Sequence, residues 1–528
     1  MNFYSRRESQ MNTIQAKERG GHRKRVGTWL LMTTMMLIAS CTDLEESPFS
    51  SITPTNFYGN EEEVRAGVAA VYNQLNSVST GNYHYLNTIS SDEQVIPTRG
   101  QDWYDNGLHL ENQYQAWEPN SPSGLGTVNN AWNQSFQGVA RANVLLEAIE
   151  ELPVANKERT IAEVRVLRAW FYYTLMDLFG GVPIVTTTEI APRERAARAE
   201  VFAFVEQELL AAKPDLPVTW PSSDYGRVTQ GSVDAILASL YLNAHVFTGT
   251  VTEAGLQPGT ARWQDAYDAA DRVINGPYSL TSDWYANFRA DNNTSPEIVF
   301  VSARRPESGI SLNFISDRLH YNQFSPAPNN GRAAEPPTYR KFDDDDLRKT
   351  IFLVGPQNHL VTGDPVNDRA GVRLNYTVDF ADITQATEGE GARVYKWPFD
   401  PNRVGTNHGN DFPIFRLAGM YLIKAEAANE LGRPAEAVAL MNTVRERVFD
   451  PDEPLSAGLS QAQVRTAILD ERLFELMDEA KRRADLIRHG QWTAESYEKP
   501  AREGYRVLMP IPQTQLDANP LLEQNPGY

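Results

Sequence analysis

Beyond about residue 60, apolar residues recur three and four positions apart, which is the period of amphipathic helices. Three apolar stripes are especially regular, and they begin at Val233, Ala437 and Leu469. The periodicity predicts helices near residues 61–76, 129–151, 157–179, 198–212, 231–247, 263–275, 415–431, 434–448 and 461–488. The pattern therefore indicates a mostly α-helical protein.

Several of the expected helices form pairs. Within 415–448, one helix should stop at Gly432, and Pro434 suits the first turn of the next. This pair resembles a tetratricopeptide hairpin, and 231–247 with 263–275 would form a second one that carries a long insertion. Repeats this scattered favour a shell of stacked helices over a long regular solenoid.

Two long stretches lack helical periodicity. Residues 77–128 and 276–410 are rich in Gly, Asn, Pro, Asp and aromatic residues, and 297–303 ("EIVFVSA") is their best strand candidate. Long loops in a compact protein are usually functional or poorly ordered. We expect these stretches to pack into one irregular, loop-rich lobe that carries the binding surface.

We therefore expect one domain over residues 60–528. Its helical repeats would lie mainly in 60–76, 129–275 and 415–490. Its irregular lobe would comprise mainly 77–128 and 276–410.

The only cysteine, Cys41, directly follows the one strongly apolar stretch, residues 26–40. That stretch is preceded by basic residues and is short for a bilayer span, so residues 1–40 indicate a signal peptide. The triplet 38–40 (Ile-Ala-Ser) resembles the lipobox of bacterial lipoproteins, in which the cysteine is lipidated and becomes residue 1 of the mature chain. Several acyl chains, palmitate among them, would anchor it durably. An ordinary secretory peptide and a buried free cysteine are the alternatives.

Residues 41–59 then indicate a lipidated cysteine and a flexible tether. The segment has acidic residues at Asp43, Glu45 and Glu46, followed by Ser, Thr and Pro. It is also similar to the acidic export tag of surface-displayed lipoproteins in some Gram-negative bacteria. That similarity implies an outer-membrane location that faces the extracellular side.

Charge excludes one large class of partner. The chain has a formal net charge of −19, and the first 40 residues are locally basic. The mature surface would therefore repel phosphate backbones, and no basic stripe is interleaved with aromatic residues. We expect no nucleic-acid binding, whereas ten tryptophans and 22 tyrosines leave aromatic rings for the surface.

Residues 98–107, "TRGQDWYDNG", combine flat rings with polar side chains. Sugar rings stack their C–H faces on Trp and Tyr, and their hydroxyls need polar partners that fix orientation. The stretch would supply Trp103 and Tyr104 as a platform and Arg99, Asp102 and Asn106 as a rim. The alternative is structural: Trp103 fills an apolar gap and Asp102 caps a turn.

A second candidate patch lies in residues 317–324, "DRLHYNQF". There Tyr321 could stack on a sugar, and Asn322 or Gln323 could donate hydrogen bonds. Trp117, Trp284 and Tyr285 are better explained as structural residues.

Three segments together carry a family resemblance. They are 164–186 ("VRVLRAWFYYTLMDLFGGVPIVT"), 468–492 ("ILDERLFELMDEAKRRADLIRHGQW") and 508–528 ("LMPIPQTQLDANPLLEQNPGY"). All three resemble the SusD/RagB family of outer-membrane nutrient-binding lipoproteins, and their order is shared with the lipobox and the hairpin at 415–448. The resemblance implies a SusD-like helical superhelix that holds an oligosaccharide, or in some members a peptide. It implies delivery to a partner TonB-dependent, SusC-like transporter, with no catalysis.

A glycoside hydrolase is the rival from the enzyme class, because it would add two carboxylates to an aromatic groove. The obvious acids have simpler explanations. Glu471, Glu475 and Glu479 follow one face of the expected last helix, which indicates an exposed, salt-bridged surface. The run 343–346 (four Asp) indicates a helix cap and a turn, with calcium the lesser alternative.

The sequence contains no motif for zinc binding, for a nucleophile-elbow hydrolase or for nucleotide binding. The histidines lack zinc-ligand spacing, and neither GxSxG nor a P-loop is present. We therefore expect no metal, no cofactor and no enzymatic activity. A helical scaffold that binds only protein is a third hypothesis, which the long aromatic loops disfavour.

Overall fold

A computed structural model describes residues 58–528, and these belong to one unit. The predicted signal peptide, Cys41 and nearly all of the tether fall outside the described residues. Helices that follow one another in the chain pack side by side in the pairs α6–α7, α7–α8 and α14–α15, and α3 packs on α6 and α9 on α11 across intervening short helices. The main helices are α3 (Glu61–Thr80), α6 (Asn129–Glu151), α7 (Lys157–Phe179), α8 (Arg198–Ala212), α9 (Gln230–Leu242), α11 (Trp263–Ile274), α14 (Leu417–Glu430), α15 (Pro434–Arg445), α16 (Gln461–Leu476) and the shorter α17 (Arg482–Arg488).

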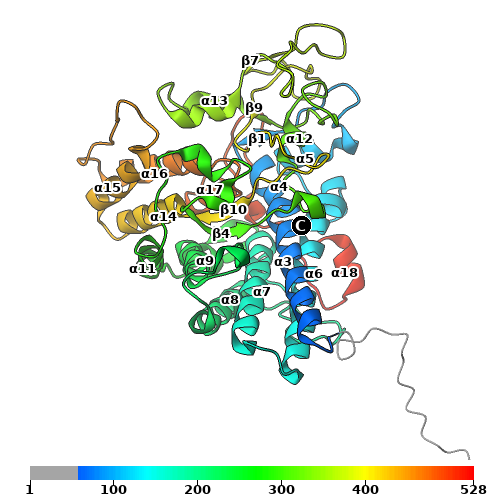
Figure 1. Ribbon diagram of the computed structural model, residues 1–528, viewed down its shortest axis with the longest axis vertical. Helices are drawn as coiled ribbons and strands as arrows, with labels where there is room; N and C mark the ends of the chain where they lie inside the picture. The colour runs from blue at the N-terminus through cyan, green and yellow to red at the C-terminus, as the bar shows by residue number, and fades with distance from the viewer. Residues whose placement is uncertain (1–57) are drawn as a thin grey trace, which may run out of the picture. The chain divides into compact units, whose positions relative to one another are not determined.

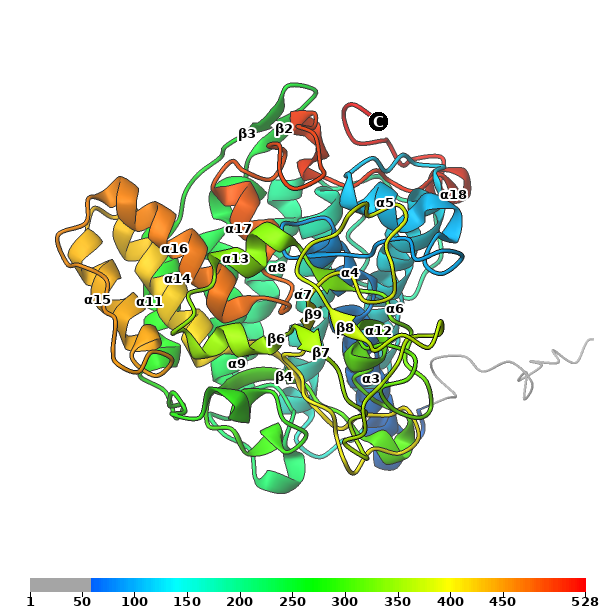
Figure 2. The same cartoon turned by 90° about the horizontal axis from the view of Figure 1, so that it is seen from above.

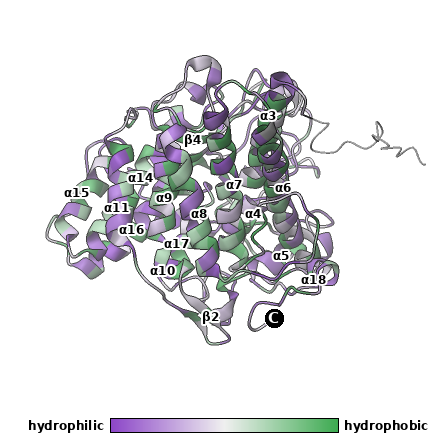
Figure 3. Ribbon diagram, turned by 90° about the horizontal axis from the view of Figure 1, so that it is seen from below, coloured by the Kyte–Doolittle hydropathy of each residue, from purple (hydrophilic) through white to green (hydrophobic). Residues whose placement is uncertain are grey.

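These helices confirm the mostly α-helical fold class, and local capping explains several of their ends. Asn60 caps α3 by accepting from the backbone N–H groups of Glu62 and Glu63. Gly432 follows α14 with a φ of +78°, a left-handed conformation that glycine adopts at little cost. Along the helices, hydrophilic and hydrophobic positions alternate in bands (Figure 3).

Two of the expected helices are shorter than predicted. The helix expected over 231–247 ends at Leu242, and α10 (Ala244–Phe247) follows it directly. The helix expected over 461–488 ends at Leu476 and resumes at Arg482 as α17. Between them Asp478 and Ala480 have φ values of +64° and +57°. The break turns the Asp478 carboxylate inward, where Arg318 holds it with two hydrogen bonds of 2.8 and 2.6 Å.

The acidic face of α16 is buried, so the prediction of an exposed, salt-bridged surface is wrong. Glu471, Glu475 and Glu479 are at most 2% exposed. Their partners come from distant parts of the chain, and Glu475 accepts from Arg416 Nη1 and Arg447 Nη2 at 2.6 Å each. Burial of a charge requires such pairing, because an isolated carboxylate in the interior would be too costly.

The irregular lobe lies above the helices in Figure 1 and contains short elements only. Backbone pairing joins its two stretches, since β1 (Gln94–Val95) is antiparallel to β5 (Ala333–Ala334). The other short elements of the lobe are α4 (Asn82–Ile89), α5 (Leu108–Gln113), α12 (Phe314–Arg318), α13 (Pro336–Lys341), β6 (Phe352–Leu353) with β9 (Arg393–Val394), and β7 (Gly355–Pro356) with β8 (Asn375–Tyr376). Outside the lobe lie α18 (Gln513–Ala518) and the hairpin of β2 (Thr250–Thr252) and β3 (Gly255–Gln257). Seen from above, α14 and α15 lie on the left of the molecule, and α3 and α6 lie on the right (Figure 2).

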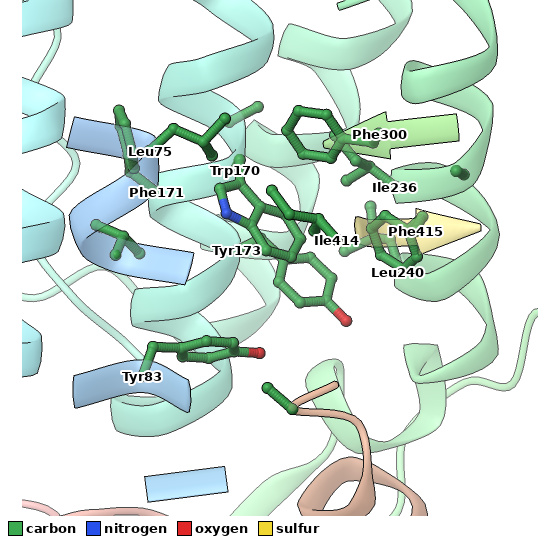
Figure 4. Close-up of a cluster of buried hydrophobic side chains, with 14 of the residues drawn as sticks. Leu75, Tyr83, Trp170, Phe171, Tyr173, Ile236, Leu240, Phe300, Ile414 and Phe415 are labelled. Carbon is green, nitrogen blue, oxygen red and sulfur yellow. The ribbon is translucent and has the colours of Figure 1, made fainter. Parts of the chain in front are cut away.

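An antiparallel ribbon connects the helices to the lobe. β4 (Ile298–Ser302) confirms the predicted strand and pairs with β10 (Phe412–Arg416). Phe300 and Phe415 from this ribbon each meet the Trp170 ring edge-on, at centroid distances of 5.8 Å (Figure 4). Tyr173 stacks on the same indole at 5.1 Å. The core therefore runs from α7 into the base of the lobe.

Trp117 and Trp284 are structural, as predicted, and Tyr285 packs edge-on against Trp284 and hydrogen-bonds to Thr350. Trp117 and Trp284 have no exposed surface. Asp346 caps the turn at 347–351 by accepting from the backbone N–H of Arg348, which confirms the interpretation of the aspartate run.

Candidate functional site

The loop that holds the first candidate patch is tightly folded. Arg99 and Asp102 exchange both backbone hydrogen bonds, at 2.9 and 3.0 Å. Trp103 and Asn106 have φ values of +62° and +55°, and Gly107 follows at +82°. Left-handed conformations in non-glycine residues are costly, and they cluster where the surrounding structure holds a functional loop in place.

The structure brings the two predicted patches together. Tyr321 donates from its hydroxyl to Asp102 Oδ2 at 2.8 Å, although the two residues are 219 positions apart. Arg369 donates to the same oxygen at 2.5 Å, and its guanidinium lies 4.3 Å from the centre of the Tyr321 ring. We call Asp102, Trp103, Tyr104, Asn106, Tyr321 and Asn322 the aromatic site.

Trp103 is held in a defined orientation. Its indole N–H donates to the carbonyl of Asn329 at 2.7 Å, and its ring meets His109 at a centroid distance of 5.2 Å. Gly331 lies beneath the ring, where an added Cβ would stand 2.6 Å from Trp103 Cζ2. The indole is nevertheless partly exposed, so its platform is rigid and still accessible.

The remaining members differ in how much they are engaged. Tyr104 is 57% exposed, and Asn106 is exposed as well. Asn322 is exposed and donates from its amide to the carbonyl of Asn367 at 2.9 Å. These side chains present one large ring and two amides to solvent.

Arg99 does not form part of the rim. It is 2% exposed, and its guanidinium donates to the backbone carbonyls of Thr387 and Glu390. Burial lowers the pKa of Arg99 well below its usual value. The side chain therefore holds the loop against residues 387–390, and we leave it out of the aromatic site.

Three residues beside the aromatic site were not predicted from the sequence, namely His320, Arg369 and Glu388. Arg369 bridges Asp102 and Glu388, and His320 Nε2 lies 2.9 Å from Glu388 Oε2. Although burial favours the neutral carboxyl, hydrogen bonds from Arg369 and His320 hold the pKa of Glu388 below its usual value. No motif marks Arg369, because nothing in its local sequence shows that two loops will meet beside it.

The aromatic site is suited to binding more than to acid catalysis. Within the site, the Asp102 carboxylate accepts hydrogen bonds from Tyr321 and Arg369. The neighbouring Glu388 carboxylate also accepts a hydrogen bond from Arg369. A general acid needs a raised pKa, whereas that of Glu388 is lowered. Aromatic rings beside fixed polar groups match the needs of a polyhydroxylated ligand.

Gly331→Ala is expected to weaken ligand binding about three-fold or more, because the new methyl group would push the Trp103 ring out of position. The measurement is a calorimetric titration of both proteins with the ligand. Gly458→Ala is the matched control, since its nearest neighbouring atom would lie 3.7 Å from the added Cβ. Equal affinities of the Gly331 variant and the wild type would contradict this account of the platform.

Two hollows lie elsewhere on the surface of the described residues. One of about 750 Å³ is lined by segments 289–293, 303–307 and 398–402, and one of about 790 Å³ by α3, residues 154–160 and residues 223–227. None of the residues of the aromatic site lines either hollow. The aromatic site is therefore a surface platform outside these clefts.

Asp411 lines the first hollow, and burial raises its pKa to about 6. Because the folded state then binds the proton more tightly than the unfolded state, stability falls as the pH rises from about 4 to 6. Asp411→Asn removes this ionisation and should stabilise the protein by up to about 3 kcal/mol at pH 7. Urea unfolding at pH 4 and pH 7 measures the effect, and an equal difference at both pH values would contradict it.

Neither metal ligation nor a membrane span is evident in residues 58–528. No cluster of three or more His, Cys, Asp or Glu residues there could hold a metal ion. No helix in the same range combines the length and the apolar character that a bilayer crossing requires.

Family models match most of the chain. Residues 44–242 match the family described as "Starch-binding associating with outer membrane", and residues 275–528 match the SusD family. The chain belongs to the SusD/RagB family. The two matches leave out only the extreme N-terminus and residues 243–274, so family membership extends over both the helices and the lobe.

Individual relatives agree with that assignment. A SusD-like protein of Formosa agariphila is 26% identical, over 94% of this chain and 99% of its own length. The starch-binding protein SusD of Bacteroides thetaiotaomicron is 26% identical, over 74% of this chain and 76% of its own. A solved laminarin-binding SusD-like protein superimposes with a TM-score of 0.69 at 24% identity, covering 89% of this chain and 100% of that one. That likeness shows a shared SusD-like fold.

Proposed function

We propose that this SusD/RagB protein is a cell-surface lipoprotein that captures an oligosaccharide and passes it to a TonB-dependent, SusC-like transporter in the outer membrane. The observation that carries the proposal is the hydrogen bond from Tyr321 to Asp102, which brings the second predicted patch beside the fixed indole of Trp103. Named relatives bind starch and laminarin, which are both neutral glucans. A neutral or weakly charged glycan is therefore the proposed ligand.

A glycan screen tests the proposal. A soluble form that starts at Thr42 should migrate more slowly in gels that contain starch, laminarin or another neutral polysaccharide. It should release no reducing ends from the polysaccharide that it binds. Binding of peptides alone would favour a peptide-binding member of the family, and sustained release of reducing ends would favour a glycoside hydrolase.

The proposed anchor is the lipid on Cys41, which lies outside the described residues. Cys41→Ala should move the protein from the membrane fraction to the soluble fraction, because the thiol that carries the diacylglycerol is lost. Immunoblots of fractionated cells measure the distribution. Continued membrane retention of the variant would contradict lipid anchoring at this residue.

The proposed partner follows from family membership. We propose that the tetratricopeptide-like hairpin α14–α15 lies on the side that faces the transporter and that the lobe faces the ligand. Co-purification of the native protein with a TonB-dependent barrel would support this arrangement, and isolation of the native protein without one would contradict it.

A further inference from the structure

The two hollows meet and form one longer groove, which we call the joined cleft. Ser223, Tyr225, Ala303 and Arg305 line both of them. α3 and β4 contact each other beside this junction and lie close together in Figure 1. The joined cleft therefore runs from the α3 side of the helical layer to the base of the lobe, apart from the aromatic site.

Arg305 and Arg159 are the arginines of the joined cleft that reach solvent without a carboxylate within ion-pair distance, whereas the buried Arg304 donates to Thr80 Oγ1. Among the described residues, no carboxylate oxygen lies within 4.0 Å of the guanidinium of Arg305 or Arg159. Arg305 is exposed at the junction and uses only its backbone groups, in hydrogen bonds with Ile310. Arg159 lies 5.1 Å from the centre of the Trp220 ring.

Two acids of the joined cleft are engaged by other groups. Asp224 lies 2.7 Å from Arg227 Nη1, whereas Arg159 acts on it only at longer range. Asp411 is 3% exposed and accepts from the backbone N–H of Arg304 at 2.6 Å. Burial raises the pKa of this carboxyl to about 6, so at pH 7 it is mostly ionised and offsets part of the charge on Arg305. Because the Asp411 carboxylate lies beyond ion-pair distance, the hydrogen-bond donors of the Arg305 guanidinium remain unused by the described residues.

The rest of the lining favours a sugar. The partly exposed Tyr225 offers an aromatic ring, and Asn293 and Asn402 offer amides to hydroxyl groups. Asp291 and Glu307 also line the lobe end, and they would repel a ligand with many negative charges. A neutral oligosaccharide that bears a single carboxylate fits both the unused arginine donors and the acidic residues at the lobe end.

We propose that the joined cleft is a second ligand site, which binds a short oligosaccharide bearing a single carboxylate. Arg305 pairs with that carboxylate at the junction, and Arg159 adds positive charge at the α3 end. Guanidinium and carboxylate groups match in geometry and form strong charge-assisted hydrogen bonds. This site does not depend on the aromatic site, and it can hold a different ligand or a second part of a branched one.

Calorimetric titration of the complete chain in detergent tests the site with two acidic probes, glucuronosyl-xylotriose and sialyllactose. At least one of them should bind the wild type, and Arg305→Ala should weaken that binding about ten-fold or more, as loss of a charged hydrogen bond requires. The methyl ester of the same probe should bind the wild type no more tightly than the acid binds the Arg305 variant. Arg340→Ala is the control, because Arg340 is exposed and pairs with Asp379 outside the cleft.

Trp103→Ala separates the two sites and should leave the affinity for the acidic probe unchanged. Failure of both acidic probes to bind the wild type would overturn the proposal, as would equal affinities of the Arg305 variant and the wild type. Loss of acid binding in the Trp103 variant alone would place the carboxylate at the aromatic site. Tighter binding of tetraglutamate than of either sugar would assign the cleft to acidic peptides.

Discussion

Replacement of Glu475 by alanine is expected to lower the free energy of unfolding by about 3–5 kcal/mol, because it leaves buried charges without their partner. Glu475 is completely buried and lies within 2.6–3.2 Å of guanidinium nitrogens of Arg348, Arg416 and Arg447. It also accepts from the indole N–H of Trp284 at 3.1 Å. Urea unfolding of the two proteins measures the loss.

Glu430→Ala is the matched control on the neighbouring helix. Glu430 pairs with Arg465 at 2.7 Å, but the two side chains are 17% and 46% exposed. Exposed pairs contribute little, so this variant should lose less than about 1 kcal/mol. Similar losses of unfolding free energy in both variants would contradict the prediction that the buried network contributes more than an exposed pair.

The same network predicts how stability depends on pH. Burial opposes ionisation of Glu475, but the three arginines outweigh it and hold its pKa well below the usual value. Its stabilising contribution is therefore complete above the pKa of the unfolded chain and is lost as the pH falls toward the folded value. The wild type should lose stability below about pH 4, whereas Glu475→Ala should lose less over the same interval.

Trp103→Ala is expected to weaken oligosaccharide binding about ten-fold or more, because stacking on an aromatic ring contributes roughly 1–3 kcal/mol where it has been measured on nucleic-acid bases. The indole is a platform fixed by Asn329, His109 and Gly331, so its loss removes a preorganised contact. Titration calorimetry with the best ligand from the glycan screen measures the change.

Trp263→Ala provides the control for this variant. Trp263 is partly buried at the start of α11, where it packs against His245 with a centroid distance of 4.9 Å, and it is not part of the aromatic site. Its removal should leave ligand affinity unchanged. An intact Trp103 variant that binds as tightly as the wild type would remove Trp103 from the site.

The helices could be predicted from the sequence because their signals are local. The stripe that begins at Ala437 lies on α15, and Gly432 and Pro434 mark the turn before it. The buried face of α16 could not be predicted in the same way. Charged side chains four residues apart usually lie on the surface, and only the approach of Arg348, Arg416 and Arg447 from distant segments makes their burial possible.

The aromatic site shows the same division. Its side-chain types could be chosen from short stretches, since Trp103 beside Asp102 and Tyr321 beside Asn322 are local combinations of ring and rim. Their meeting depends on loop packing across 219 positions, which no local pattern records. The prediction that Arg99 belongs to the rim is wrong for the same reason. Its burial depends on the backbone carbonyls of Thr387 and Glu390, which no local pattern indicates.

The most direct test of the central claim is a crystal structure of the protein with an oligosaccharide identified by the screen. The account predicts a sugar ring stacked on Trp103, with hydroxyl groups within hydrogen-bond distance of Asp102, Asn106 or Asn322 and with Tyr321 alongside. An oligosaccharide that binds with full occupancy elsewhere, while Trp103 and Tyr321 remain free of ligand, would contradict it.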